Sequence, residues 1–344
     1  MKCSDGPWGI VFAFQGREND ISSDQLELLL DALCHALSAR LADDGESKQG
    51  LHRELAFLAK LAAPEHLTIL RERRETEFES MLRDFVLKIG PKIGRSPSGE
   101  GAPAIAVLSL IGGTGLTAVA NEFLLSDDEH GKLDAIAWAG KRPDEETFDR
   151  LVSIVQSEEQ WPGSGESSFP VNQNAAMKVL AEHGRWEQVI DGLKKWGMRT
   201  SPDLKGCAGP VAEPWVDGLR HEVELTPTPG NVIALGTVGG SQDCSLIHSL
   251  LDQCEDTSEL AHACIIALED LDDTSDEGVL RVSNHLAIEN QRYSTVCMLT
   301  NAGTPSAWQT LFTDLQENFD FVTALNLIKH RSGNYCREYL RKCL

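Results

Sequence analysis

Apolar residues recur at spacings of three and four along most of this sequence, which is the period of amphipathic helices. In residues 25–42 the leucines follow this period after Ser22, Ser23 and Asp24, residue types that cap helix N-termini. A second such stretch extends over residues 66–89, where the polar face, residues 71–80, mixes both charges and is expected to face solvent. The pattern therefore predicts mainly helices in residues 1–90.

One short segment near the N-terminus departs from the helical period. Residues 8–14, WGIVFAF, form an apolar run bounded by Gly6, Pro7 and Gly16, which predicts a strand. We therefore interpret residues 1–90 as an N-terminal extension that holds one strand, or as capping helices.

Gly, Pro and Ser gather in three breaks of the helical pattern. Two are short, at residues 90–103 and 161–170, and the third lies between Trp196 and Gly230. The third is too long for an ordinary connection, so it predicts a functional loop, an insertion or a domain boundary. The breaks divide the chain into an N-terminal extension, a first group of helical repeats, a Pro/Gly-rich loop or insertion, and an acidic C-terminal group of repeats: residues 1–90, 104–195, 196–230 and 231–344.

Between the breaks, one helix of small and branched apolar residues ends at a turn, and an amphipathic helix begins a few residues later. Four of the six steps between successive turns are 26 to 33 residues long, which is the size of a two-helix repeat. Glycine suits such turns because it adopts the left-handed conformation that ends a helix. The expected turn positions are Gly112, Gly140, Gly184, Gly239, Asp272, Gly303 and Lys329.

Residues 234–251, ALGTVGGSQDCSLIHSLL, resemble the core of HEAT-like repeats, and residues 104–125 and 296–315 resemble it more loosely. Residues 175–193 are similar to a TPR unit, which makes TPR-like repeats the nearest alternative. The resemblance covers residues 104–343. It implies an all-α fold, an α-solenoid in which antiparallel helix pairs stack and present a curved surface.

Composition excludes several classes of function. The 344 residues include 31 Lys and Arg against 53 Asp and Glu, a net charge of −22. This balance argues against a general nucleic-acid binder and against docking on anionic membranes. No window has the apolar length of a transmembrane helix. The nine cysteines form no C-x-x-C pair and no zinc-ligand spacing, which predicts reduced thiols and a cytoplasmic protein.

Motifs for chemistry are few. Residues 113–118, GTGLTA, match the G-x-G-x-x-[GA] pattern of dinucleotide sites, but an alanine-rich helical pattern follows, so we interpret the segment as a turn between helices. His221 and Glu222 form a lone pair that does not supply converging metal ligands. The sequence therefore predicts no catalytic residues, no metal site and no cofactor.

The negative charge is local. Residues 221–280 contain 13 acids and no Lys or Arg, and ten of these acids fall within residues 251–277. Helix capping and helix dipoles do not require so many. The candidate partner-binding residues are these ten acids and one aromatic residue of the Pro-rich segment: Asp252, Glu255, Asp256, Glu259, Glu269, Asp270, Asp272, Asp273, Asp276, Glu277 and Trp215.

These features predict a non-catalytic interaction protein (an adaptor, scaffold or regulatory inhibitor) that presents an acidic surface to a basic protein partner. Two alternatives stay open. One is a nucleic-acid mimic that occupies a DNA- or RNA-binding protein, and the other is a ligand-binding or lyase-like α-solenoid. The sign of the charge reverses near the C-terminus, which would permit self-association through Lys329, Arg331, Arg337, Arg341 and Lys342.

Overall fold

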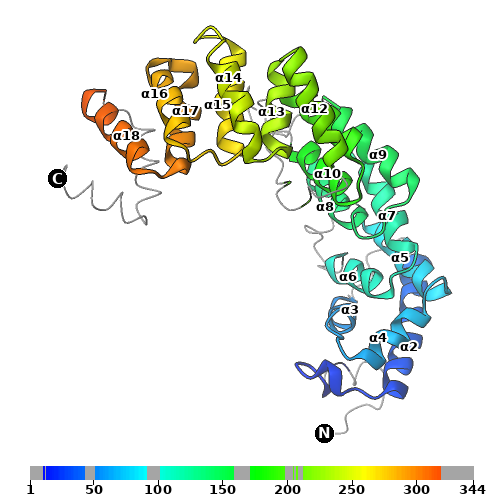
Figure 1. Cartoon of the computed structure of the whole chain (residues 1–344). Coiled ribbons are helices and arrows are strands. Elements are labelled where there is room, and N and C mark those ends of the chain that lie inside the picture. The colour runs from blue at the N-terminus through cyan, green and yellow to red at the C-terminus, as the bar shows by residue number, and fades with distance from the viewer. Residues whose placement is uncertain are drawn as a thin grey trace. The chain divides into compact units, whose positions relative to one another are not determined.

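The structure is a computed structural model that describes residues 11, 13–42, 51–90, 101–158, 171–197, 204, 207 and 212–318. The described residues form the helices α2 to α18 and short 3-10 helices, with no strand among them (Figure 1). The predicted all-α fold of antiparallel helix pairs is confirmed. The chain divides into two compact units, Met1–Ser157 and Glu158–Leu344. The boundary falls inside the segment 104–195, which the sequence pattern treats as one group.

In the first unit, α5, α7 and α9 pack in succession as one layer, α2 covers α4 and α5, and α3 and α4 pack against α6. The residues before 90 therefore pack directly against the first repeats. The α-helices are α2 (Ser23–Ala42), α3 (His52–Leu58), α4 (Pro64–Glu72), α5 (Glu77–Ile89), α6 (Gly101–Ile111), α7 (Gly115–Leu124), α8 (Glu129–Ala139) and α9 (Glu145–Gln156).

Two expectations for this unit are wrong. Val11 and Ala13 are helical, so the described part of the segment 8–14 is not a strand. The stretch 66–89 is not one helix, because the chain turns between α4 and α5. Glu75 has a φ of 58° there, in the left-handed region, which interrupts the helix without a glycine or proline.

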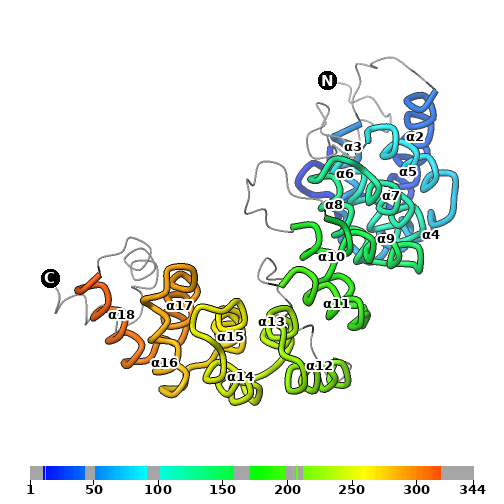
Figure 2. Tube along the Cα trace, turned by 90° about the horizontal axis from the view of Figure 1, so that it is seen from above, coloured from blue at the N-terminus to red at the C-terminus, as the bar shows by residue number. Residues whose placement is uncertain are grey.

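In the second unit, α11, α13, α15 and α17 pack in succession as one layer, and α14, α16 and α18 form the layer beside it (Figures 1 and 2). Turns within and between pairs therefore alternate between the two edges of this unit. The α-helices are α10 (Val171–Glu182), α11 (Trp186–Trp196), α12 (Glu213–Leu225), α13 (Pro229–Val238), α14 (Cys244–Leu251), α15 (Glu259–Asp270), α16 (Asp276–Ser283), α17 (Glu289–Ala302) and α18 (Pro305–Glu317).

Left-handed turns occur at most of the expected positions. Gly112, Gly184, Gly303 and Asp272 have φ values of 68°, 74°, 61° and 55°. Gly140 and Gly239 end their helices with negative φ, at −60° and −76°. The remaining expected position, Lys329, lies outside the described residues.

The segment 196–230 contains a helix, α12, rather than only a loop or insertion. Pro214 lies in the first turn of α12, and Pro229 begins α13. A proline at the start of a helix loses no hydrogen bond and already has a helical φ. The prolines that we interpret as breaks in the sequence therefore also mark helix starts.

Candidate functional site

The ten candidate acids fall into two groups at opposite ends of α15. The first acidic turn connects α14 to α15 and contains Asp252, Glu255, Asp256 and Glu259. The second acidic turn extends from the end of α15 into α16 and contains Glu269, Asp270, Asp272, Asp273, Asp276 and Glu277. Because α15 has 12 residues, its ends lie about 18 Å apart. The predicted acidic surface is therefore two surfaces, one on each edge of the second unit.

In the first acidic turn, three carboxylates have no local partner. Glu255, Asp256 and Glu259 are exposed, and their side chains make no hydrogen bond or ion pair with any residue that the structure describes. Asp252 differs, because its Oδ1 lies 2.9 Å from Nε of Arg281. The unpaired negative charge of this turn is thus concentrated in three neighbouring residues.

The backbone of the first acidic turn is held by neutral groups. The Ser258 side chain caps α15 by accepting from the Ala261 amide at 3.1 Å. Gln291 of α17 donates its Nε2 to the carbonyl oxygens of Asp256, at 2.7 Å, and Ser258, at 3.3 Å. The acids of this turn are therefore not needed to cap the helix or to fix the turn.

Asp273 does not belong to a surface. Its side chain is buried, with Oδ2 2.7 Å from Nε2 of His248 and Oδ1 accepting from the Ser275 amide at 3.0 Å. A Cβ at Gly278 would overlap this carboxylate, so glycine makes room for it. The expectation that Asp273 is available to a partner is wrong, because His248 of α14 and the turn itself enclose it.

The other acids of the second turn have partners nearby. Glu277 lies 2.7 Å from Arg281, Asp276 accepts from Ser306 at 2.5 Å, and Glu269 accepts from Asn301 at 2.9 Å. Hydrogen bonds with Glu277 and then Asp252 raise the pKa of Arg281 above its usual value. Asp272 is exposed, and Asp270 is half-buried.

Trp215 lies apart from both acidic turns. It is 42% exposed on α12, which packs against α11 and α13 rather than α15. Arg220 of the same helix contacts two acids of α12, Glu213 and Asp217, and also Asp243, which lies just before α14. These hydrogen bonds, with Asp243 first, raise the pKa of Arg220.

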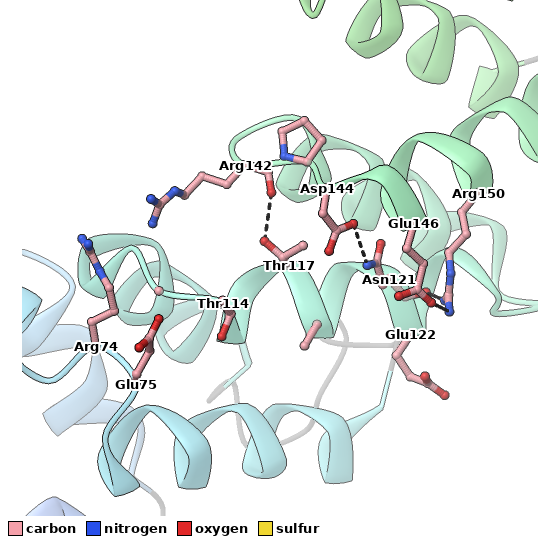
Figure 3. A pocket seen from close by; sticks show the side chains of 13 residues that line it. Arg74, Glu75, Thr114, Thr117, Asn121, Glu122, Arg142, Asp144, Glu146 and Arg150 are labelled. Atoms are coloured by element: carbon pink, nitrogen blue, oxygen red, sulfur yellow. Dashed lines mark hydrogen bonds and ion pairs between the residues drawn. The ribbon is translucent and has the colours of Figure 1, made fainter.

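The first unit contains a polar groove of about 630 Å³ along α7 (Figure 3). Every second turn from α4 to α9 supplies its walls: Arg74 and Glu75 lie between α4 and α5, Thr114 lies between α6 and α7, and Arg142 lies between α8 and α9. The sequence pattern does not single out this groove, because its residues come from turns that lie far apart in the sequence.

A buried carboxylate organises one wall of this groove. Glu79 is 3% exposed and accepts from the Gly115 amide at 2.6 Å and from the Glu75 amide at 2.5 Å. A Cβ at Gly113 would overlap the carboxylate. The expectation that residues 71–80 are solvated is therefore wrong at Glu79. The glycines of the GTGLTA segment accommodate this side chain, and the residues before them form α6 rather than the strand of a dinucleotide site.

The far end of the groove is closed by capping and ion pairing. Asp144 caps α9 by accepting from the Thr147 amide at 2.8 Å, and the Thr147 hydroxyl holds the pKa of Asp144 below its usual value. Asn121 donates to Asp144 at 3.4 Å. Arg150 pairs with Glu146 at 2.5 Å. The charges at this end are thus largely matched within the protein.

The described residues offer no metal cluster, since no group of three or more His, Cys, Asp or Glu among them could hold an ion. His221 and Glu222 diverge, because Nδ1 of His221 lies 3.9 Å from Glu224 while Glu222 pairs with Lys194. Burial raises the pKa of the Cys244 thiol to about 11, which disfavours a reactive thiolate. No described helix is long and apolar enough to cross a bilayer.

No protein-family model matches this sequence, and no curated protein matches it either. The resemblance to HEAT-like repeats therefore stays a prediction from the sequence.

Proposed function

We propose that this protein is a non-catalytic interaction protein of HEAT-like architecture, an adaptor, scaffold or regulatory inhibitor, and that its first acidic turn binds a basic protein partner. One observation carries the proposal. Glu255, Asp256 and Glu259 are exposed side by side without a cationic partner among the described residues, in a turn whose helix is already capped by Ser258.

Neighbouring like charges that face solvent repel each other and lower stability slightly, and no ion pair within the described protein offsets this repulsion. They become favourable when a partner supplies Lys or Arg. Such a surface raises the local concentration of a basic partner and speeds its association, an effect that salt screens. The second acidic turn contributes less, because Asp273 is buried and Glu277 pairs with Arg281.

The test neutralises the first acidic turn without changing its shape, in the triple variant Glu255→Gln, Asp256→Asn and Glu259→Gln. The matched control is Glu65→Gln, Asp149→Asn and Glu187→Gln, which removes three exposed acids elsewhere. Each full-length protein is immobilised, exposed to an extract of the native host at low salt and eluted with a salt gradient, and the eluted proteins are identified by mass spectrometry.

We expect wild type and control to retain the same basic protein, and the triple variant to release it at clearly lower salt. Association measured with that protein should be several-fold slower for the triple variant, with a flatter salt dependence. If all three proteins release the same partner at the same salt, or if wild type retains no basic protein, the proposed function is wrong.

A further inference from the structure

Arg74 and Arg142 point toward the same space at one end of the groove (Figure 3). An ideal Cβ on Gly112 would lie 3.5 Å from Nη2 of Arg74 and 3.7 Å from Nη1 of Arg142. The two nitrogens therefore lie within about 7 Å of each other. No ion pair with a described carboxylate links either guanidinium, although both side chains are exposed.

Helix capping explains only one of these arginines. Arg74 donates weakly, at 3.5 Å, to the Ile111 carbonyl in the last turn of α6, an interaction that favours a cation. The Arg142 side chain makes no hydrogen bond or ion pair with the described part of the chain. The Arg142 guanidinium therefore adds electrostatic repulsion with Arg74 without a stabilising contact in the described part of the chain.

The turns that carry both arginines are fixed in place. The Glu75 amide, next to Arg74, donates to the buried Glu79 carboxylate. The Thr117 hydroxyl of α7 donates to the Arg142 carbonyl at 2.9 Å, which ties the α8–α9 turn to the floor of the groove (Figure 3). The backbone beneath each guanidinium is thus held before any ligand arrives, which reduces the entropy lost on binding.

We infer that Arg74 and Arg142 together bind an oxyanion, a phosphate or carboxylate group of a ligand that enters this groove. Charge-assisted hydrogen bonds of about 2.8 Å from each guanidinium to two oxygens of one such group can bridge nitrogens at this separation. The volume of the groove is within the range of small-molecule sites. Thr114 offers a hydroxyl group along the groove, and Glu122 lines it away from the two arginines (Figure 3).

The site is independent of the proposed function, since it lies in the other unit and takes a ligand of opposite charge. Its test uses the full-length protein and two probes, inorganic phosphate and acetate, titrated by calorimetry at constant ionic strength. The variants are Arg74→Gln, Arg142→Gln and the double variant. Arg71→Gln is the matched control, because Arg71 is an exposed arginine of α4 that does not line the groove.

We expect saturable millimolar binding of at least one probe to wild type and to the control. Each single variant should lose affinity for the probe by up to about tenfold, and the double variant should not bind it detectably. The stronger probe identifies phosphate or carboxylate as the group that the ligand carries. Equal melting temperatures of variants and control establish that the fold is intact. The inference is overturned if neither probe saturates wild type at tens of millimolar, or if the double variant binds as wild type does.

Discussion

Successive helix pairs are joined differently in the two units. In the first unit, the Glu79 carboxylate of α5 reaches the start of α7, where Gly113 and Gly115 make room for it. In the second unit, backbones meet directly: an added Cβ at Gly236 of α13 would lie 2.5 Å from Cα of Ala267 in α15. In both places the absence of a side chain on glycine makes the contact possible. It makes room for a charged side chain in the first unit and for a neighbouring helix in the second.

The difference shows where each unit places its carboxylates. The first unit uses a buried carboxylate, that of Glu79, to fix a turn, and the exposed positions around it carry both arginines and acids. The second unit also buries a carboxylate, Asp273, but it joins α13 to α15 by backbone contact and caps α13, α15, α16 and α18 with the hydroxyl groups of Thr228, Ser258, Ser275 and Thr304. Most acids of its first acidic turn therefore neither cap a helix nor pair with a cation among the described residues.

The largest expected effect comes from removing the buried carboxylate of the first unit. Glu79→Ala leaves the amides of Glu75 and Gly115 without their acceptor and should lower the free energy of unfolding by about 3 kcal/mol. Urea unfolding measures the loss, and amide hydrogen exchange should locate it in α5 to α7. Glu72→Ala, which removes an exposed acid of α4, should change stability by less than about 0.5 kcal/mol. A similar effect of both variants would contradict the structural role of Glu79.

The next effect tests the backbone contact of the second unit. Gly236→Ala places a methyl group against Ala267 and should lower stability by about 1–3 kcal/mol, despite the better helix propensity of alanine. Gly218→Ala is the matched control, because an added Cβ at this position in α12 meets nothing within 4 Å.

Gly218→Ala should raise stability by about 0.5–1 kcal/mol, because alanine favours the helix and its methyl group meets no neighbour. Opposite signs in thermal unfolding would establish that α13 and α15 touch at Gly236. Two stabilising substitutions would contradict that contact.

The smallest effect distinguishes the caps of the two units by pH. Asp144→Ala and Ser275→Ala each remove an N-cap and should each cost about 1 kcal/mol at pH 7. The Thr147 hydroxyl lowers the pKa of Asp144 in the folded protein, so its contribution is present above the unfolded pKa of about 3.9 and is lost as pH falls through the lower folded value. The cost of Asp144→Ala should therefore shrink between about pH 5 and pH 2, while that of Ser275→Ala stays constant. Parallel pH profiles would rule out an ionised cap.

The sequence pattern predicts the helix pairs well because both of its signals are local. The period of the leucines in α2 matches their burial, with Leu26, Leu29 and Leu33 fully buried. Glycines at 112, 184 and 303 stop helices through their own conformational freedom. Such features depend on neighbours in the chain and can be recognised without a structure.

The parts that the sequence does not predict depend on distant residues. Glu75 adopts a left-handed φ, and Glu79 binds the Glu75 amide and reaches α7, 36 positions later. Asp273 differs from Asp272 partly through His248, which lies 25 positions earlier. In a one-dimensional pattern all these acids have the same appearance, so buried anchors and exposed charges cannot be separated. The same limit applies to Arg74 and Arg142, which the fold alone brings together.

The hydrogen bonds from Gln291 have a consequence for how the chain can be shortened. Its amide holds the carbonyls of Asp256 and Ser258, so the repeat that begins with α17 completes the backbone of the preceding one. A fragment that stops before α17 would keep every acid of the first acidic turn but leave two carbonyls without their donor. The smallest piece able to present this turn in its native form therefore extends into α17, two α-helices beyond α15, the helix that begins with Glu259.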